Sequence, residues 1–289
     1  MTESGHEGQA AGHDAFVLVG FDGSRDAAGA IAVSASLLPG VAARVVTVWA
    51  PPGGDAVLRR RVMQQARTVD ELSALMVQEA VAAAEQIAAD GAALARDRGW
   101  SAEPGTRKGY GDAGIVLAHL AGELHPAAVV VGSRGLSGTA AALGSVSDLV
   151  VHHCPVPVLV VPPLLSGERA AAATGPVLVG HDGSEGAEHA RAAAAALLPG
   201  REQVLVHVTP ASGATEPPPP DAVALAAHGW GGRGAAASLD AEAAARDAAL
   251  IVVGSRGRSM LRELVLGSTA TAVLHHVHRP VLVVPSPRG

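Results

Sequence analysis

The chain has 289 residues, which is enough for two ordinary domains. Hydrophobic residues make up 48% and charged residues 17%, so a buried core is available and a chain that is disordered throughout is excluded. The formal net charge of -6 argues against a general binder of the nucleic-acid backbone. The 2% of aromatic residues also leaves few rings on which bases could stack.

Single residue types narrow the function further. Lys108 is the only lysine, and it does not stand in the G-x-x-x-x-G-K-[ST] pattern of a P-loop ATPase. Cys154 is the only cysteine, which excludes an intrachain disulfide and a site with several thiolate ligands. No apolar run approaches the roughly 18 residues of a membrane helix. Residues 1–14 are polar and lack the apolar core of a signal peptide, so we expect a flexible tail and a cytoplasmic protein.

The first predicted element is a short apolar strand that ends in polar turn residues. Residues 17–24 read Val-Leu-Val-Gly-Phe-Asp-Gly-Ser, and their Asp and Ser suit a turn and a helix cap. A helical pattern follows until Pro39 and Gly40 end it. Nearly the same opening returns at 177–184, and the Leu-Leu-Pro-Gly ending returns at 197–200, each 160 positions later.

A long helix is predicted next, but only in the first copy. Six apolar residues share one helical face there, namely Leu72, Leu75, Met76, Ala83, Ile87 and Leu94. The matching interval of the second copy holds four consecutive prolines at 217–220, which cannot propagate a helix. We therefore expect the second copy to lack this helix and to keep the following strand within 222–230, as the match of 107–110.

Two further blocks complete an internal duplication. Val-Val-Val-Gly-Ser-Arg-Gly at 129–135 returns as Ile-Val-Val-Gly-Ser-Arg-Gly at 251–257, and Val-Leu-Val-Val-Pro at 158–162 returns at 281–285. The offset falls from 160 to 122 at the glycine block, so the second copy is 38 residues shorter between these points. Four blocks repeated in the same order indicate a tandem duplication.

Apolar strands alternate with helices in both copies, which predicts an α/β fold with parallel sheets. Continuous apolar runs are typical of strands that are buried on both faces, and right-handed crossovers place helices on both sides of the sheet. We expect two tandem doubly wound, Rossmann-like domains, the second lacking one helix. Their expected bounds are 15–163 and 175–286, with a linker at 164–174.

The glycine loop of the second copy has the chemistry of a phosphate site. Gly254-Ser-Arg-Gly257 is followed by nine residues and then by Gly267-Ser268-Thr269, which opens a helix. Glycines allow a sharp turn and the close approach of a ligand to the backbone. The start of a helix offers unpaired N–H groups and the positive end of the dipole, which favour phosphate. The carboxyl edge of an open α/β sheet is also where such folds bind ligands.

These motifs together resemble the universal stress protein family in its ATP-binding branch. They are G-x2-G-x9-G-[ST], the Val-Gly-x-Asp-Gly-Ser opening and the Pro-Val-Leu-Val-Val-Pro last strand, and the resemblance runs from about Phe16 to Pro285. It implies a five-stranded parallel sheet flanked by helices in each copy. It also implies that ATP, or another adenine nucleotide, lies at the carboxyl edge of the strands with Mg²⁺ or Mn²⁺.

The resemblance implies roles for individual residues. In the second copy Asp182 lies near the phosphates and the metal ion, the backbone of Val208 meets the adenine, and ribose and phosphates contact Gly254, Gly257, Gly267, Ser268 and Thr269. The matching residues of the first copy are Asp22, Val48, Gly132, Gly135, Gly144, Ser145 and Val146. Arg134 and Arg256 lie inside the two loops, where they either screen phosphate charge or are ordinary exposed arginines.

Each copy departs from the family pattern in its own way. The first copy has eight residues between Gly135 and Gly144 instead of nine, which either tightens the loop harmlessly or displaces Ser145. The second copy lacks the long helix, which could open its adenine side to solvent. The sequence leaves open whether one copy or both bind a nucleotide.

The aspartates and two pairs of histidines have alternative interpretations. Asp22 and Asp182 also suit turn formation and helix capping, without any metal. The pairs His152-His153 and His275-His276 suggest metal ligands, but adjacent residues on a helix point about 100° apart and chelate poorly. Histidines at the carboxyl end of a helix also favour the dipole there.

We expect a stress-response regulator or sensor rather than a fast enzyme, because the chain supplies phosphate-binding backbone but no evident general base. Slow ATP hydrolysis is compatible with this role. The alternatives are a scaffold or chaperone-like stress protein with decayed pockets, and an enzyme that hydrolyses ATP or transfers adenylate. The last strands, at 158–161 and 281–284, are expected to pair as an intramolecular pseudo-dimer. A homodimer of the whole chain is also compatible, whereas nucleic acid and membranes are not expected partners.

Overall fold

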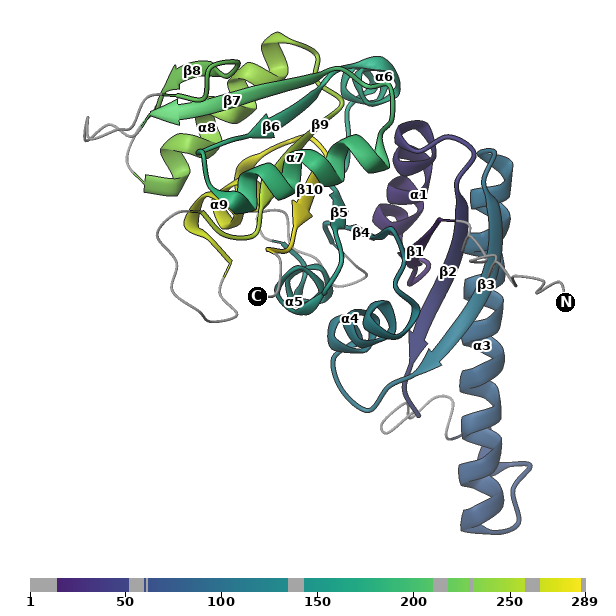
Figure 1. The fold of residues 1–289 in the computed structure, drawn as a ribbon. Helices are drawn as coiled ribbons and strands as arrows, with labels where there is room; N and C mark the ends of the chain where they lie inside the picture. The colour runs from purple at the N-terminus through teal and green to yellow at the C-terminus, as the bar shows by residue number, and fades with distance from the viewer. Residues whose placement is uncertain are drawn as a thin grey trace, which may run out of the picture.

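A computed structural model describes residues 15–51, 60, 62–134, 143–209, 218–228, 231–257 and 266–286. Its strands form one sheet in the order β3-β2-β1-β4-β5-β10-β9-β6-β7-β8 (Figure 1). The strands of the first half are β1 (Phe16–Gly20), β2 (Ala42–Trp49), β3 (Ser101–Lys108), β4 (Ala128–Gly132) and β5 (Val158–Val161). Those of the second half are β6 (Val177–Gly180), β7 (Gln203–Thr209), β8 (Val223–Ala226), β9 (Leu250–Gly254) and β10 (Val281–Val284).

Helices cover both faces of this sheet. The helices are α1 (Arg25–Leu37), α3 (Val69–Asp97), α4 (Ala113–Leu124), α5 (Ser145–His153), α6 (Ser166–Thr174), α7 (Glu185–Leu197), α8 (Gly231–Ala245) and α9 (Ser268–His276). One apolar core lies under α1, α3, α6 and α7, and the other lies under α4, α5, α8 and α9. Successive strand residues alternate between the two cores, as Val17 and Leu18 do, because side chains of a strand point to opposite faces.

Strand direction changes only at the middle of the sheet. All pairings within each half are parallel, as predicted, whereas β5 and β10 pair antiparallel with Leu159 opposite Leu282. The predicted pairing of the two last strands within one chain is therefore confirmed. Because strand direction reverses there, the strands of the first half and those of the second half have their carboxyl ends at opposite ends of the sheet.

The predicted helix of the first half is confirmed as α3, which packs closely on the sheet. A Cβ on Gly91 would lie 2.6 Å from the Phe21 ring and 2.9 Å from Val45, so only a glycine fits between helix and strands. The amino-terminal part of α3 runs on past the sheet (Figure 1). In the second half, no described residue between β7 and β8 is helical, and β8 lies inside the predicted range 222–230.

The segment between the halves is more ordered than a linker. The expected linker at 164–174 contains helix α6, which packs against α1. Arg201 fixes its end, because this guanidinium donates to the carbonyls of Gly175 (2.9 Å), Ala173 (2.7 Å) and Ala172 (3.2 Å). Among the described residues, no helix is both long and apolar enough to cross a membrane.

Candidate functional site

The predicted site residues gather at the carboxyl edge of each half. Gly132 and Gly254 are the last residues of β4 and β9, and the two aspartates stand two residues beyond the ends of β1 and β6. Strands β1 and β4 are neighbours, and so are β6 and β9, which brings each aspartate near its glycine loop. Gly135 lies outside the described residues. The structure therefore assembles two candidate sites, one in each half and at opposite edges of the sheet.

Both aspartates make the tight turn that the sequence allowed for. The N–H of Ser24 donates to Oδ1 of Asp22 at 2.9 Å, and Ser184 donates to Oδ1 of Asp182 at 3.0 Å. The intervening glycines have φ of 79° and 81°, a left-handed conformation that glycine adopts without strain. The turn-forming role of both residues is thus visible, and it occupies one carboxylate oxygen of each.

The serine of each turn caps the helix that follows. Oγ of Ser24 accepts from the N–H of Ala27 at 3.1 Å, and Oγ of Ser184 accepts from Ala187 at the same distance. Helices α1 and α7 therefore use their own side chains to satisfy an amino-terminal N–H group.

Helices α5 and α9 begin differently, because each has a glycine at its cap. Gly144 and Gly267 have no side chain that could accept from the first N–H groups of the helix, which have no acceptor inside it. The cap N–H groups themselves are in use, since Gly144 donates to the Ser133 carbonyl at 2.7 Å and Gly267 donates to Ser255 at 2.8 Å. These bonds close each glycine loop on itself and hold the helix start in place.

The second oxygen of Asp182 faces the glycine loop of its own half. A Cβ built on Gly257 would lie 2.7 Å from Oδ2 of Asp182. Gly257 does not have a positive φ, so this close approach, rather than backbone strain, is the reason for a glycine at this position. An acidic group, the loop and the start of α9 thus converge in the second half.

The glycines at the strand ends serve packing as well. A Cβ on Gly132 would lie 3.1 Å from the Asp26 carbonyl, and a Cβ on Gly254 would lie 3.0 Å from the Gly186 carbonyl. Helices α1 and α7 therefore pass directly over these strand ends. The motifs predicted only turns and ligand approach for these glycines, because the helix packing joins residues that are far apart in the chain.

The remaining predicted residues line the same edges. Val48 and Val208 are the penultimate residues of β2 and β7, both half-buried, with Arg107 and Leu225 as their partners on the next strand. The two halves differ behind the helix start, where Ser147 donates to the Gly132 carbonyl at 2.6 Å. The repeat places Ala270 at the matching position of the second half. Ser147 was missed because serine within a helix carries no distinctive sequence signal.

The histidine clusters are not arranged as metal sites. Within the described part of the chain, no group of three His, Cys, Asp or Glu side chains is placed to hold a metal ion. Nδ1 of His152 lies 2.8 Å from the Asp148 carbonyl, one turn back in α5. The rings of His275 and His276 are 6.5 Å apart and tilted by 55°.

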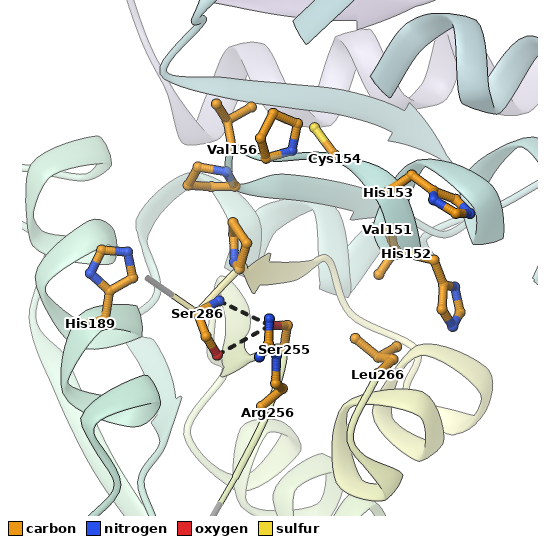
Figure 2. A pocket seen from close by; sticks show the side chains of 13 residues that line it. Val151, His152, His153, Cys154, Val156, His189, Ser255, Arg256, Leu266 and Ser286 are labelled. Carbon is orange, nitrogen blue, oxygen red and sulfur yellow. Dashed lines mark hydrogen bonds between the residues drawn. The ribbon is translucent and has the colours of Figure 1, made fainter. Parts of the chain in front are cut away.

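A pocket at the seam between the halves was not expected from the sequence. This seam pocket has a volume of about 480 Å³ and is lined by residues 151–157 of the first half and by His189, Ser255, Arg256 and Ser286 of the second (Figure 2). Cys154 also lines this pocket, and burial raises the pKa of its thiol from 9.0 to about 11. The walls of the pocket come from four distant parts of the chain, so no local sequence motif predicts the pocket.

Comparisons with known proteins agree with this architecture. A model of the universal stress protein family matches residues 16–162 and 221–285. The solved structure of a universal stress protein from Archaeoglobus fulgidus DSM 4304 is similar over 94% of this chain and 97% of its own, with a TM-score of 0.62 and 19% identity. A functionally unknown protein from Pseudomonas aeruginosa PAO1 is similar over 95% of this chain and 93% of its own, with a TM-score of 0.56 and 13% identity.

A curated relative matches over a shorter stretch. A universal stress protein from Synechocystis sp. is 55% identical over 38 residues, which are 13% of this chain and 35% of that relative. The match therefore spans about a third of the length of this curated protein.

Proposed function

Because the chain belongs to the universal stress protein family, we propose that it binds an adenine nucleotide, with ATP as the expected form, and acts as a stress-response regulator. The nucleotide would lie at the carboxyl edge of β6, β7 and β9, across the glycine loop and the start of α9. The matching edge of β1, β2 and β4 is the second candidate site. We propose the same nucleotide class for it.

One observation carries the proposal, namely the convergence of Asp182 on the glycine loop. Its Oδ1 is held by the turn, and its Oδ2 points to Gly257, where an added Cβ would crowd it. A carboxylate beside a helix start that favours anions is suited to a divalent ion that both the carboxylate and phosphates can ligate. The residues present thus fit a nucleotide accompanied by Mg²⁺ or Mn²⁺, with Asp182 as the protein ligand.

The start of α9 would hold the phosphates. Ser268 and Thr269 form its first turn, where backbone N–H groups point out of the helix and the hydroxyls can add donors. Gly267 is fixed by its bond to the Ser255 carbonyl, so the first turn is positioned before any ligand arrives. Binding a nucleotide would then require little reordering of the backbone, which favours affinity.

A regulatory role follows from what this edge supplies. Backbone donors and a carboxylate recognise a charged ligand, while fast hydrolysis also needs a base that activates water. We expect phosphate release in the presence of Mg²⁺ to be far slower than 1 s⁻¹, the low end of ordinary enzymes. Turnover at or above that rate would show that the protein is an ATP-consuming enzyme.

Calorimetric titration with Mg-ATP tests the proposal directly. We expect binding at one or two sites per chain, and Asp182→Asn should weaken binding at the second-half site by about tenfold, or ~1.4 kcal/mol. Asparagine keeps the Oδ1 acceptor of the turn and removes only the charge, so the fold should be unaffected. Asp22→Asn is the matched variant of the first half.

Asp90→Asn is the control, because Asp90 lies on the exposed side of α3, where it accepts a hydrogen bond from Gln86 at 2.8 Å. Gly257→Val should also abolish binding in the second half, since its side chain would displace the Asp182 carboxylate and cover the loop. Equal affinity in the wild type, Asp182→Asn and Gly257→Val, with Asp22→Asn combined to silence the first half, would refute the site.

A second candidate function is a scaffold that binds no nucleotide. The observation that favours it is the packing of α1 and α7 over Gly132 and Gly254, which gives both strand-end glycines a structural reason. Mass spectrometry of the denatured protein separates the two functions. Co-purified adenine nucleotide supports binding, whereas its absence together with no heat on titration supports the scaffold.

A further inference from the structure

The seam pocket combines polar side chains with an apolar wall. His189 projects from α7 on one side, the Ser255, Arg256 and Ser286 group lies in the middle, and His152 lies on the opposite side, on α5 (Figure 2). The loop before β5, residues 154–157, forms the remaining wall with apolar side chains, and Leu266 and Pro285 extend it. The volume of about 480 Å³ lies within the roughly 300–1,000 Å³ of small-molecule sites.

Two hydroxyls at the centre of the pocket are held in place. The N–H of Ser286 donates to Oγ of Ser255 at 3.0 Å, and the two Oγ atoms are 3.5 Å apart (Figure 2). The Oγ of Ser255 thus accepts a bond that fixes its position, while its own proton can be donated elsewhere. This short bridge between the ends of β9 and β10 gives the pocket a preformed donor set.

The charge of the pocket has one sign. Its lining residues, all in the described part of the chain, include Arg256 and three histidines but no aspartate or glutamate. Among the described residues, no salt bridge includes Arg256 or His189, whereas Nδ1 of His152 lies 3.6 Å from the Asp148 carboxylate, which does not line the pocket. The net charge of the whole chain is -6, so a basic pocket without a carboxylate is a local exception. An anion would supply the charge that the protein itself does not provide there.

We propose that the seam pocket binds a small organic phosphate, a phosphomonoester with an apolar or aromatic body. The guanidinium of Arg256, the imidazole of His189 and the two hydroxyls offer more donors than a carboxylate with two oxygens can accept. A phosphate group with three terminal oxygens matches this donor set better. The proline and valine side chains of 155–157 would pack against the body of the ligand.

The proposal predicts one such site per chain, because the repeat has diverged at this place. The offsets of the duplication place Gly29 opposite His189 and Pro163 opposite Ser286. The matching position in the first half therefore lacks an imidazole and a hydroxyl. His152 has a counterpart in His275 at the same point of α9, which supplies a matched control residue.

The seam pocket is separate from the nucleotide site but shares its loop. Ser255 and Arg256 stand between Gly254 and Gly257, so a ligand in the pocket would contact the outer side of the same turn. The proposal does not depend on nucleotide binding, since its donors and apolar wall are complete without it. If both ligands bind, their affinities must change each other by the same factor.

Titration calorimetry with phenyl phosphate tests the proposal on the full-length protein. We expect one site per chain, and no heat with phenol, which has the ring but no charge. The double variant His189→Ala/Ser286→Ala should weaken binding by about tenfold or more. His275→Ala is the control and should bind as the wild type does. Circular dichroism spectra that match the wild type show that each variant is folded.

Three results would overturn the proposal. The first is equal affinity in the wild type and the double variant. The second is equal affinity for benzoate, which would mean that the pocket does not select phosphate. The third is loss of phenyl phosphate binding in Gly257→Val together with full competition by ATP, which would place the anion in the nucleotide site. Unchanged phenyl phosphate binding in Gly257→Val, with loss in the double variant, supports a distinct seam site.

Discussion

Cys154 shows how much the surroundings of one side chain decide its chemistry. It is 7% exposed and lies between the end of α5 and the loop before β5. Removal from water disfavours the thiolate, which raises the pKa of its thiol from 9.0 to about 11, although a backbone hydrogen bond opposes the shift. The residue lines the seam pocket as an apolar group rather than as a nucleophile.

We expect the Cys154 thiol to react slowly with a disulfide reagent at pH 8, at less than about one hundredth of its rate in denaturant, because only the thiolate attacks. The unfolded thiol ionises near pH 9 and the folded thiol near pH 11. The free energy of unfolding should therefore fall as pH rises through this interval, by up to about 3 kcal/mol. Urea titrations at several pH values measure this slope, and Cys154→Ala should lack it. Rapid labelling of the native protein would contradict the assignment.

Asp182 and Gly257 are a pair of residues whose closeness the sequence predicted. The sequence predicted that both belong to one site, and the structure brings Oδ2 of Asp182 to the Gly257 backbone. The reason for the glycine was only partly predicted, because φ depends on the final path of the loop and not on the motif. Which ligand the pair recognises is likewise beyond what residue types alone determine.

At the scale of elements, the predictions succeeded where the apolar pattern was long or repeated. The six apolar residues of the long helix all fall inside α3, although Ala83 is exposed and the buried residues of α3 are others, namely Ala84, Ala88, Gly91, Ala92 and Ala95. The buried strands match the continuous valine and leucine runs. Helix α6 was not predicted, since none of its nine residues is a large apolar residue that would mark a buried face, and Arg201 holds its end by tertiary bonds. The seam pocket could not be predicted, because it forms only when both halves meet.

The contact between α3 and the sheet yields a prediction on stability. Gly91→Ala should lower the free energy of unfolding by about 1–3 kcal/mol, because its Cβ would clash with Phe21 and Val45. Gly29→Ala in α1 is the matched control, since an added Cβ there meets nothing within 4 Å. Alanine has the higher helix propensity, so that variant should gain about 0.5–1 kcal/mol. Urea unfolding curves compare the two, and equal shifts would contradict the close packing.

At the scale of the whole molecule, the antiparallel pair of β5 and β10 makes one sheet out of two repeats. The pairing places Leu159 directly opposite Leu282, both buried. It also covers the edge strands that each half would otherwise expose, which are a hazard for aggregation. The two outer edges, β3 and β8, are the remaining ends of the sheet.

A disulfide across this pair tests whether the two strands meet within one chain. The double variant Leu159→Cys/Leu282→Cys should form an intrachain bond on oxidation, because directly opposed residues on neighbouring strands are within disulfide reach. The product should run as a monomer on a non-reducing denaturing gel, and either single variant should remain reduced. A covalent dimer of the double variant would show that the strands pair between chains instead.

The covalent union of the halves also frees each of them to specialise. In an assembly of two identical subunits, any substitution in one binding region must occur in both. Here the first half keeps α3, while the second carries His189 and Ser286 beside Arg256. Their ratio is fixed at one to one by the peptide chain, whatever the concentration of the protein. The two halves could thus evolve different binding regions while their one-to-one ratio is kept.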